Sequence, residues 1–219
     1  MKRIIKCLLE SFVLIAISAA LWQLTLFPVV DTLNKQLPLS LFQNFLIIIG
    51  IGGLVFLINW YAQKQGYLTW KLVWSDPFVS KWLLFGLVAT LVLHFLSIWV
   101  GSIEGVPYLN LSNNSKGYYL SIDLMTTVLL APLAEELVFR RILTEIIFPK
   151  NLKISLLITG ILFAAIHLPV SIGDWANQLG ASLVLSIIYY KTRKVEVGII
   201  VHSIMNLFLT ALMLWVMYK

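Results

Sequence analysis

The chain has 219 residues, of which 60% are hydrophobic and only 12% are charged, and its mean hydropathy is +0.92. Soluble domains carry roughly 45–50% apolar and about 25% charged residues, and a chain this short cannot bury so much apolar surface in one core. The composition excludes a disordered protein, a disulfide-rich secreted domain and a nucleic-acid-binding domain, so no nucleic-acid partner is expected. It predicts an all-α, polytopic helical membrane protein.

A membrane-spanning helix needs about 20 mostly apolar residues, and the sequence predicts seven spans within a single integral-membrane domain, residues 1–219. The first resembles a signal peptide at its start, but its apolar run is too long for one, so we expect an uncleaved helix. The last contains no helix breaker and counts once, whereas splitting it would give eight spans. In chain order the spans are Ile4–Val30, Phe42–Ala62, Trp82–Val100, Tyr118–Val138, Ile154–Leu168, Trp175–Tyr190 and Val195–Tyr218.

The basic residues predict the orientation of these spans in the lipid bilayer. All but three of the lysines and arginines fall on one side of the spans, the exceptions being Lys35, Lys116 and Lys219. Basic loops stay in the cytoplasm. The rule therefore predicts a cytoplasmic N-terminus and, with seven spans, an external C-terminus, and it explains the net charge of +6 without an anionic partner.

The strongest polar signal lies at the end of the fourth span, in the run APLAEELVFRR, Ala131–Arg141. A charge inside the membrane costs roughly 3 kcal/mol on insertion scales and needs a reason. Glu135 and Glu136 point about 100° apart on a helix, and Arg140 follows Glu136 at the spacing of an ion pair. This pairing leaves Glu135 unpaired and desolvated, which suits a general base. The alternative is an ordinary helix end at the membrane interface.

Two further spans each carry a histidine whose partner lies four residues away, on the same helical face. Phe163 and His167 lie in the fifth span, and His202 and Asn206 lie in the seventh. Together with Glu135 they supply a base, two imidazoles that can bind a metal or donate hydrogen bonds, and an amide donor. These are the groups needed to activate water and to stabilise a tetrahedral oxyanion.

Two common motifs of hydrolytic enzymes are absent from the sequence. It contains neither the HExxH motif of zinc proteases nor a GxSxG nucleophile elbow. Cys7 is the only cysteine, so no intramolecular disulfide and no thiolate metal site can form. His94 stands alone in the third span, and we expect it to form a hydrogen bond between helices and nothing more.

These residues resemble the CAAX protease and bacteriocin-processing family, also called the Abi or CPBP family. Its pattern is EExxxR, then FxxxH, then HxxxN or HxxxD, on three separate membrane helices. Here the pattern reads Glu135–Arg140, Phe163–His167 and His202–Asn206, in that order. The resemblance covers residues 118–208, the predicted catalytic core, whereas the first hundred residues contribute only hydrophobicity.

The resemblance implies an intramembrane endopeptidase that cleaves a peptide or a membrane-protein substrate. The family's bacterial members make a bacterial plasma membrane the expected location. The roles that the resemblance implies are water activation by Glu135 with help from His167, an oxyanion site formed by His202 and Asn206, and support of this site by Glu136, Arg140 and Phe163.

The resemblance also raises the question of a divalent metal cofactor such as zinc. Glu135, His167 and His202 could form a zinc site with an open position, but Glu135 would then be a ligand and not a free base. A glutamate mechanism without metal uses the same residues. The sequence leaves both mechanisms open, and we prefer the one that requires no metal.

Two other functions stay open at this stage. One is a non-catalytic protein, acting in bacteriocin self-immunity or as a membrane scaffold, in which the polar cluster serves only the structure. The other is a proton- or metal-coupled transporter, because carboxylates and histidines inside spans also form ion pathways. No pair of similarly interrupted helices indicates the inverted repeat of many transporters, which favours the peptidase.

Overall fold

The computed structural model describes residues 5, 9, 10, 13, 37, 39–70, 73, 75–105 and 120–217. Within these ranges the ordered segments are helices and none is a β-strand, in agreement with the all-α prediction. The first predicted span, Ile4–Val30, lies outside the described residues except for isolated positions. Cys7 and Lys116 also lie outside them.

The described part of the chain contains six helical rods. One rod, corresponding to the fourth predicted span, consists of five consecutive segments: α5 Leu120–Asp123, η4 Leu124–Leu130, α6 Ala131–Glu136, η5 Leu137–Ile142 and α7 Thr144–Ile147. The other five rods are α3 Leu41–Lys64, α4 Pro77–Ile103, α8 Leu152–Ile166, α9 Ile172–Thr192 and α10 Val195–Met217.

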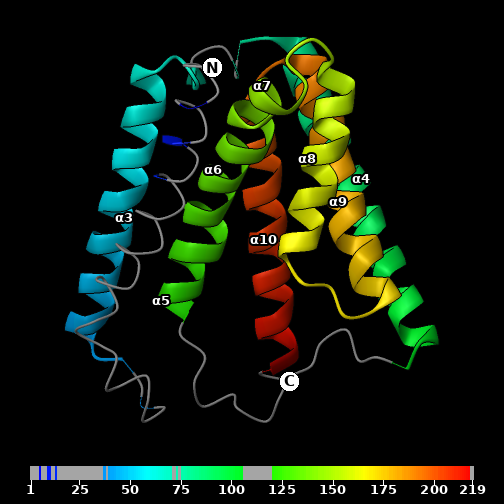
Figure 1. The fold of residues 1–219 in the computed structure, drawn as a ribbon. Coiled ribbons are helices and arrows are strands. Elements are labelled where there is room, and N and C mark those ends of the chain that lie inside the picture. The colour runs from blue at the N-terminus through cyan, green and yellow to red at the C-terminus, as the bar shows by residue number, and fades with distance from the viewer. Residues whose placement is uncertain are drawn as a thin grey trace.

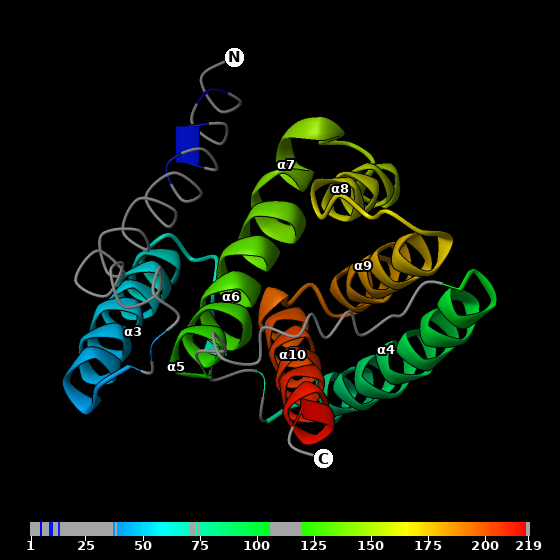
Figure 2. The ribbon, with the colours of Figure 1, turned by 90° about the horizontal axis from the view of Figure 1, so that it is seen from below.

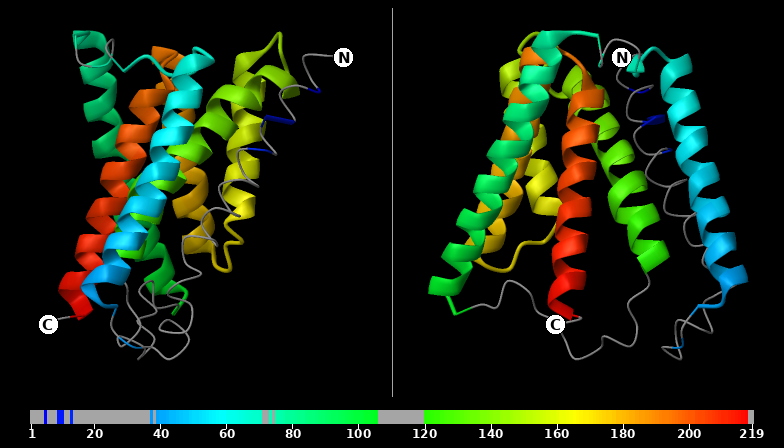
Figure 3. Two further views of the ribbon diagram at one scale, coloured as in Figure 1. Left: turned by 90° about the vertical axis from the view of Figure 1, so that its left-hand side faces the viewer. Right: turned by 180° about the vertical axis from the view of Figure 1, so that it is seen from behind.

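The rods form a bundle in which α10 occupies the middle. α3 and the α5–α7 rod lie on one side of α10, and α8, α9 and α4 lie on the other (Figure 1). The view along the bundle shows α10 between α6 and the α4–α9 pair (Figure 2). The α7–α8 and α9–α10 connections share one end of the bundle, whereas the α8–α9 connection and the end of α10 lie at the other (Figure 3).

The predicted spans agree with these helices in position, but the count of seven is not confirmed. Three described helices, α3, α4 and the first 18 residues of α10, are long and apolar enough to cross a membrane. α8 is apolar but has only 15 residues. α10 runs unbroken from Val195 to Met217, so the last span is one helix. The fourth span does not end at Val138, because the rod continues to Ile147.

Local sequence explains where these helices begin and end. A side-chain oxygen accepts a hydrogen bond from the first turn of four helices, which satisfies an otherwise unpaired N–H group. The residue after α9, Arg193, adopts a left-handed conformation with φ of 56° and lets the chain enter α10 two residues later. The four capping residues are Ser40 for α3, Asp76 for α4, Asn151 for α8 and Ser171 for α9.

α4 and α9 pack together more closely than ordinary side chains allow. A Cβ atom on Gly173 would lie 3.0 Å from backbone atoms of Gly101, so a small residue is required there. The carboxylate of Glu104, which follows α4, accepts hydrogen bonds from the backbone N–H groups of Ile172 at 2.9 Å and Gly173 at 2.8 Å. These contacts fix the register of the two antiparallel helices.

The outward faces of the bundle are apolar, as lipid-facing surfaces are. Large side chains such as Phe56, Trp60, Trp99 and Val88 are exposed along α3 and α4. Exposed apolar side chains in such number mark a surface that another apolar medium covers. Together with the apolar helices, they indicate an integral membrane protein.

The fourth rod alternates between α-helical and π-helical segments around its two glutamates. η4 ends at Leu130 and η5 begins at Leu137, so the α-helical segment with Glu135 and Glu136 lies between them. π-helical segments widen the turn and are frequent at functional sites. In η4 the carbonyl oxygen of Thr127 accepts a hydrogen bond from α10, which is part of the site described next.

Candidate functional site

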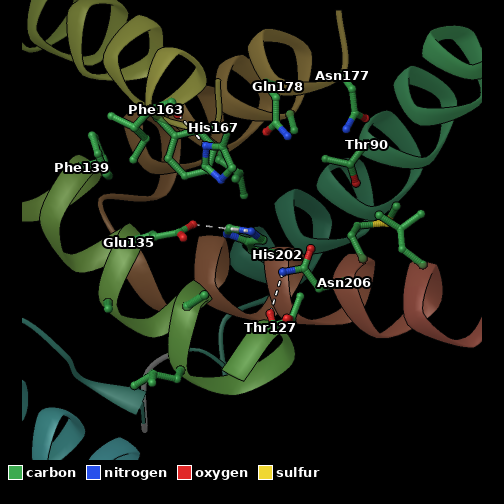
Figure 4. Close-up of a pocket in the computed structure, with 18 of the residues that line it drawn as sticks. Thr90, Thr127, Glu135, Phe139, Phe163, His167, Asn177, Gln178, His202 and Asn206 are labelled. Carbon is green, nitrogen blue, oxygen red and sulfur yellow. Dashed lines mark hydrogen bonds and ion pairs between the residues drawn. The ribbon is translucent and has the colours of Figure 1, made fainter. Parts of the chain in front are cut away.

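The residues singled out in the sequence line one cavity in the interior of the bundle. Its volume is about 870 Å³, and α4, the fourth rod, the end of α8, α9 and α10 all contribute to its walls. Glu135, His167, His202 and Asn206 all line it, and Figure 4 shows their side chains gathered around the same space. The convergence that both hydrolytic models require is therefore present.

Beside the cavity, Glu136 and Arg140 form the ion pair that their spacing predicts. Arg140 Nε lies 3.6 Å from Glu136 Oε2, and neither side chain has any exposed surface. Arg140 Nη2 donates to the hydroxyl of Ser182 at 3.1 Å and to its backbone carbonyl at 3.2 Å. The guanidinium carbon also lies 4.7 Å from the centre of the Phe163 ring. The pair thus joins the fourth rod to α8 and α9.

The carboxylate of Glu136 also lies against the backbone of α10. A Cβ atom on Gly198 would stand 2.9 Å from Glu136 Oε2. No larger residue fits at this point without moving the carboxylate. Gly198 was not singled out in the sequence analysis, because a single glycine in an apolar span carries no distinct signal.

His202 lies between the two glutamates. Its Nδ1 is 3.5 Å from Glu136 Oε1, and its Nε2 is 3.9 Å from Glu135 Oε2. The side chain of Glu135 is 25% exposed, whereas that of His202 is 14% exposed. Glu135 Oε2 thus has an imidazole near it but no hydrogen-bond partner in the part of the chain that the structure describes, and the sequence analysis did not predict this imidazole from the seventh predicted span.

His167 follows directly after α8 and is oriented by its own helix. Its Nδ1 lies 2.7 Å from the carbonyl oxygen of Phe163. A carbonyl oxygen only accepts, so Nδ1 is the donor, and in the neutral ring the lone pair is then on Nε2. The Phe163 ring packs 4.7 Å from the His167 ring and 6.0 Å from the His202 ring, measured between centroids. Phe163 therefore packs against both histidine rings.

Asn206 is held by the backbone of the fourth rod. Its side-chain Nδ2 donates to the carbonyl oxygen of Thr127 in η4 at 2.7 Å. A primary amide has two N–H groups, so this contact orients the side chain and leaves the second N–H for another acceptor. Figure 4 shows the contact at the edge of the cavity.

The wall formed by α4 and α9 is polar as well, and the sequence analysis missed most of it. Thr90, Asn177 and Gln178 line the cavity together with His94. His94 Nδ1 lies 3.3 Å from Asn177 Oδ1, which is the helix–helix contact expected for this histidine. The adjacent amides in an otherwise apolar span, Asn177 and Gln178, were the signal that could have revealed this wall.

The comparison with known proteins supports the resemblance. Residues 118–208 match the sequence model of the family described as "Type II CAAX prenyl endopeptidase Rce1-like". The resemblance inferred from the three motifs is confirmed over this segment. At the level of the family, the match supports an intramembrane protease.

One curated relative also matches part of the chain. It is the protein "UPF0177 protein YvdC" of Lactococcus lactis subsp. lactis (strain IL1403), which is 36% identical over 83 residues. The match covers 38% of this chain and 32% of the relative, so it spans about a third of that protein's length. No solved structure matches the chain.

The candidate zinc ligands do not form a metal site as they are placed. Among the described residues, no three His, Cys, Asp or Glu side chains are grouped so that they could hold one ion. A structural or catalytic zinc site needs at least three protein donors at about 2.0–2.3 Å from the metal. Glu135, His167 and His202 line the same cavity, and the choice between zinc and glutamate catalysis stays a prediction.

The neighbouring arginines Arg140 and Arg141 provide a matched test of the buried pair. Arg140→Ala leaves Glu136 as an uncompensated charge in the interior, which typically costs about 3–5 kcal/mol. Arg141 pairs with Glu145, and both side chains are more than a quarter exposed, so Arg141→Ala should cost less than about 1 kcal/mol. Thermal unfolding of both variants in detergent measures the difference. Equal midpoints for Arg140→Ala and Arg141→Ala would show that the pair is not structural.

Proposed function

We propose that the protein is an intramembrane endopeptidase that hydrolyses a peptide bond with water activated by Glu135. The observation that carries this proposal is the position of Glu135 at the cavity wall, partly accessible and 3.9 Å from His202. A partly desolvated carboxylate next to a cavity that admits water is suited to general-base catalysis.

In the proposed first step, a water molecule enters the cavity next to Glu135. The carboxylate takes one proton of the water, and the oxygen attacks the carbonyl carbon of the substrate. The lone pair on His167 Nε2 accepts a hydrogen bond from the same water and orients it. The carbon becomes tetrahedral, and its former carbonyl oxygen gains a negative charge.

In the proposed second step, His202 and Asn206 stabilise the oxyanion. The Nε2 of His202 is 3.9 Å from Glu135 Oε2, which is too far for a hydrogen bond, so an N–H group at this nitrogen can donate to the oxyanion. Asn206 contributes the N–H group that Thr127 does not use. Preorganised donors of this kind contribute roughly 10²–10³-fold to the rate. Glu135 then returns its proton to the leaving amine, and the carbon–nitrogen bond breaks.

The proposal extends to the membrane topology. We infer seven spans with a cytoplasmic N-terminus in a bacterial plasma membrane. The orientation rests on the basic residues between α7 and α8 and between α9 and α10, which share one end of the bundle. The positive-inside rule places that end in the cytoplasm. The ion pair of Arg141 and Glu145, in η5 and α7, lies toward the same end of the bundle. The substrate is a peptide or a membrane-associated protein that reaches the cavity from the aqueous phase or from the lipid.

The central prediction concerns Glu135 and a control glutamate of the same rod. Glu135→Gln keeps the shape of the side chain but removes the base, so hydrolysis should fall by about 10²–10⁴-fold. Glu145→Gln changes a partly exposed ion pair outside the cavity lining and should leave hydrolysis unchanged. The measurement compares peptides from membranes and medium of cells with each variant by mass spectrometry, and then repeats the hydrolysis with purified protein. Full activity of the purified Glu135→Gln variant would refute the mechanism.

A second prediction separates the proposed mechanism from zinc catalysis. Stringent chelation should leave hydrolysis by the purified protein unchanged, and His167→Ala should lower the rate without changing the metal content. Elemental mass spectrometry before and after chelation provides the metal content. Activity that disappears on chelation and returns with added zinc would contradict the proposal and assign Glu135 to a ligand role.

A further inference from the structure

The proposed mechanism uses Glu135, His167, His202 and Asn206 but not the two amides that α9 places in the cavity wall. Glu135, His202 and Asn206 come from the fourth rod and α10, whereas Asn177 and Gln178 project from α9 on the opposite side (Figure 4). Both amides are only partly buried and line the cavity, so they can form hydrogen bonds with the water or the substrate that occupies it.

The contacts of Asn177 leave its amide nitrogen available. Its Oδ1 faces His94 Nδ1 at 3.3 Å and accepts from the hydroxyl of Ser97 at 3.5 Å, both on α4. These contacts hold the oxygen toward α4. Neither the Asn177 nitrogen nor the amide of Gln178 has a hydrogen-bond partner in the part of the chain that the structure describes. Gln178 thus offers an acceptor and donors, and Asn177 offers donors.

The charge of this wall restricts what it can bind. Among the described residues that line the cavity, none is a lysine or an arginine, and Glu135 is the only acidic one. A substrate group with a negative charge would find no lysine or arginine here and would face the carboxylate of Glu135 across the cavity. Side-chain amides match the N–H and C=O groups of a peptide bond, which are neutral and come as a donor and an acceptor.

We propose that Gln178 and Asn177 form the subsite that holds the main chain of the substrate, as an extended and uncharged peptide segment next to the scissile bond. This proposal rests on the proposed function, because only a peptidase would hold a peptide substrate in the cavity across from Glu135. A cavity of about 870 Å³ is within the range of roughly 300–1,000 Å³ that ligand pockets occupy. The packing of Gly173 against Gly101 keeps α9 in register with α4 and so holds both amides in place.

The experiment measures hydrogen bonds to individual backbone groups of a bound peptide. A fluorescent peptide is selected from a synthetic library for binding to the full chain with Glu135→Gln in nanodiscs, and its affinity is measured by anisotropy. Each backbone N–H is then replaced in turn by an ester oxygen, which removes one donor. The same series is measured with Gln178→Met added, and with Gln63→Met, an exposed amide of α3, as the control.

The subsite predicts coupling between one peptide position and Gln178. One ester should weaken binding to the parent protein and to the Gln63→Met control by roughly 3- to 10-fold, the contribution of a single hydrogen bond. With Gln178→Met added, the all-amide peptide should bind roughly 3- to 10-fold more weakly, and the same ester should weaken its binding no further. A general loss of packing would weaken all peptides alike and would not remove the effect of one ester.

Three results would overturn the subsite. The first is that each ester changes the affinity equally with and without Gln178→Met. The second is that no ester weakens binding to the protein that keeps Gln178, and the third is that no peptide binds at all. The second needs no variant of Gln178, so the test stands even if Gln178→Met fails to fold. If wild-type protein hydrolyses the peptide and Glu135→Gln does not, while the profiles are identical, the peptidase stands and the subsite falls. Coupled binding without hydrolysis by the wild type supports the subsite and contradicts the peptidase.

Discussion

The buried ion pair of Glu136 and Arg140 is the constraint on which the rest of the site depends. Neither side chain has exposed surface, and a charge left alone in such an interior costs several kcal/mol. The carboxylate lies against Gly198 of α10, and the guanidinium bonds to α9 and lies over the Phe163 ring of α8. One pair on the fourth rod therefore fixes its contacts with three other helices. Glu135 is the residue before Glu136, so the same contacts place it at the cavity wall.

Local spacing was enough to predict the parts of the site that lie on one helix. The four-residue separation of Glu136 and Arg140 predicted their ion pair, which the structure contains. Apolar runs predicted the α3, α4 and α10 helices to within a few residues, because few sequences of that length form anything else in a membrane. The single helix from Val195 to Met217 followed from the absence of any breaker.

Contacts between helices could not be predicted in the same way. The proximity of His202 to Glu135 depends on how α10 crosses the fourth rod, and no spacing along the chain encodes it. The π-helical segments on both sides of α6 also change which residues share a face over longer stretches of the rod, and no pattern in the sequence marks where they begin. Gln178 was missed because amides in an apolar helix match no motif, and only the cavity shows its position.

The central claim is that Glu135 activates water and does not itself attack the substrate. The most direct test is a single turnover in water enriched in ¹⁸O, with protein in excess over a cleavable peptide. Direct attack by water predicts one ¹⁸O atom in the new carboxylate of the peptide product and none in Glu135, as read by mass spectrometry of both. An unlabelled product together with ¹⁸O in the Glu135 carboxylate would show a covalent intermediate at this residue and would contradict the account.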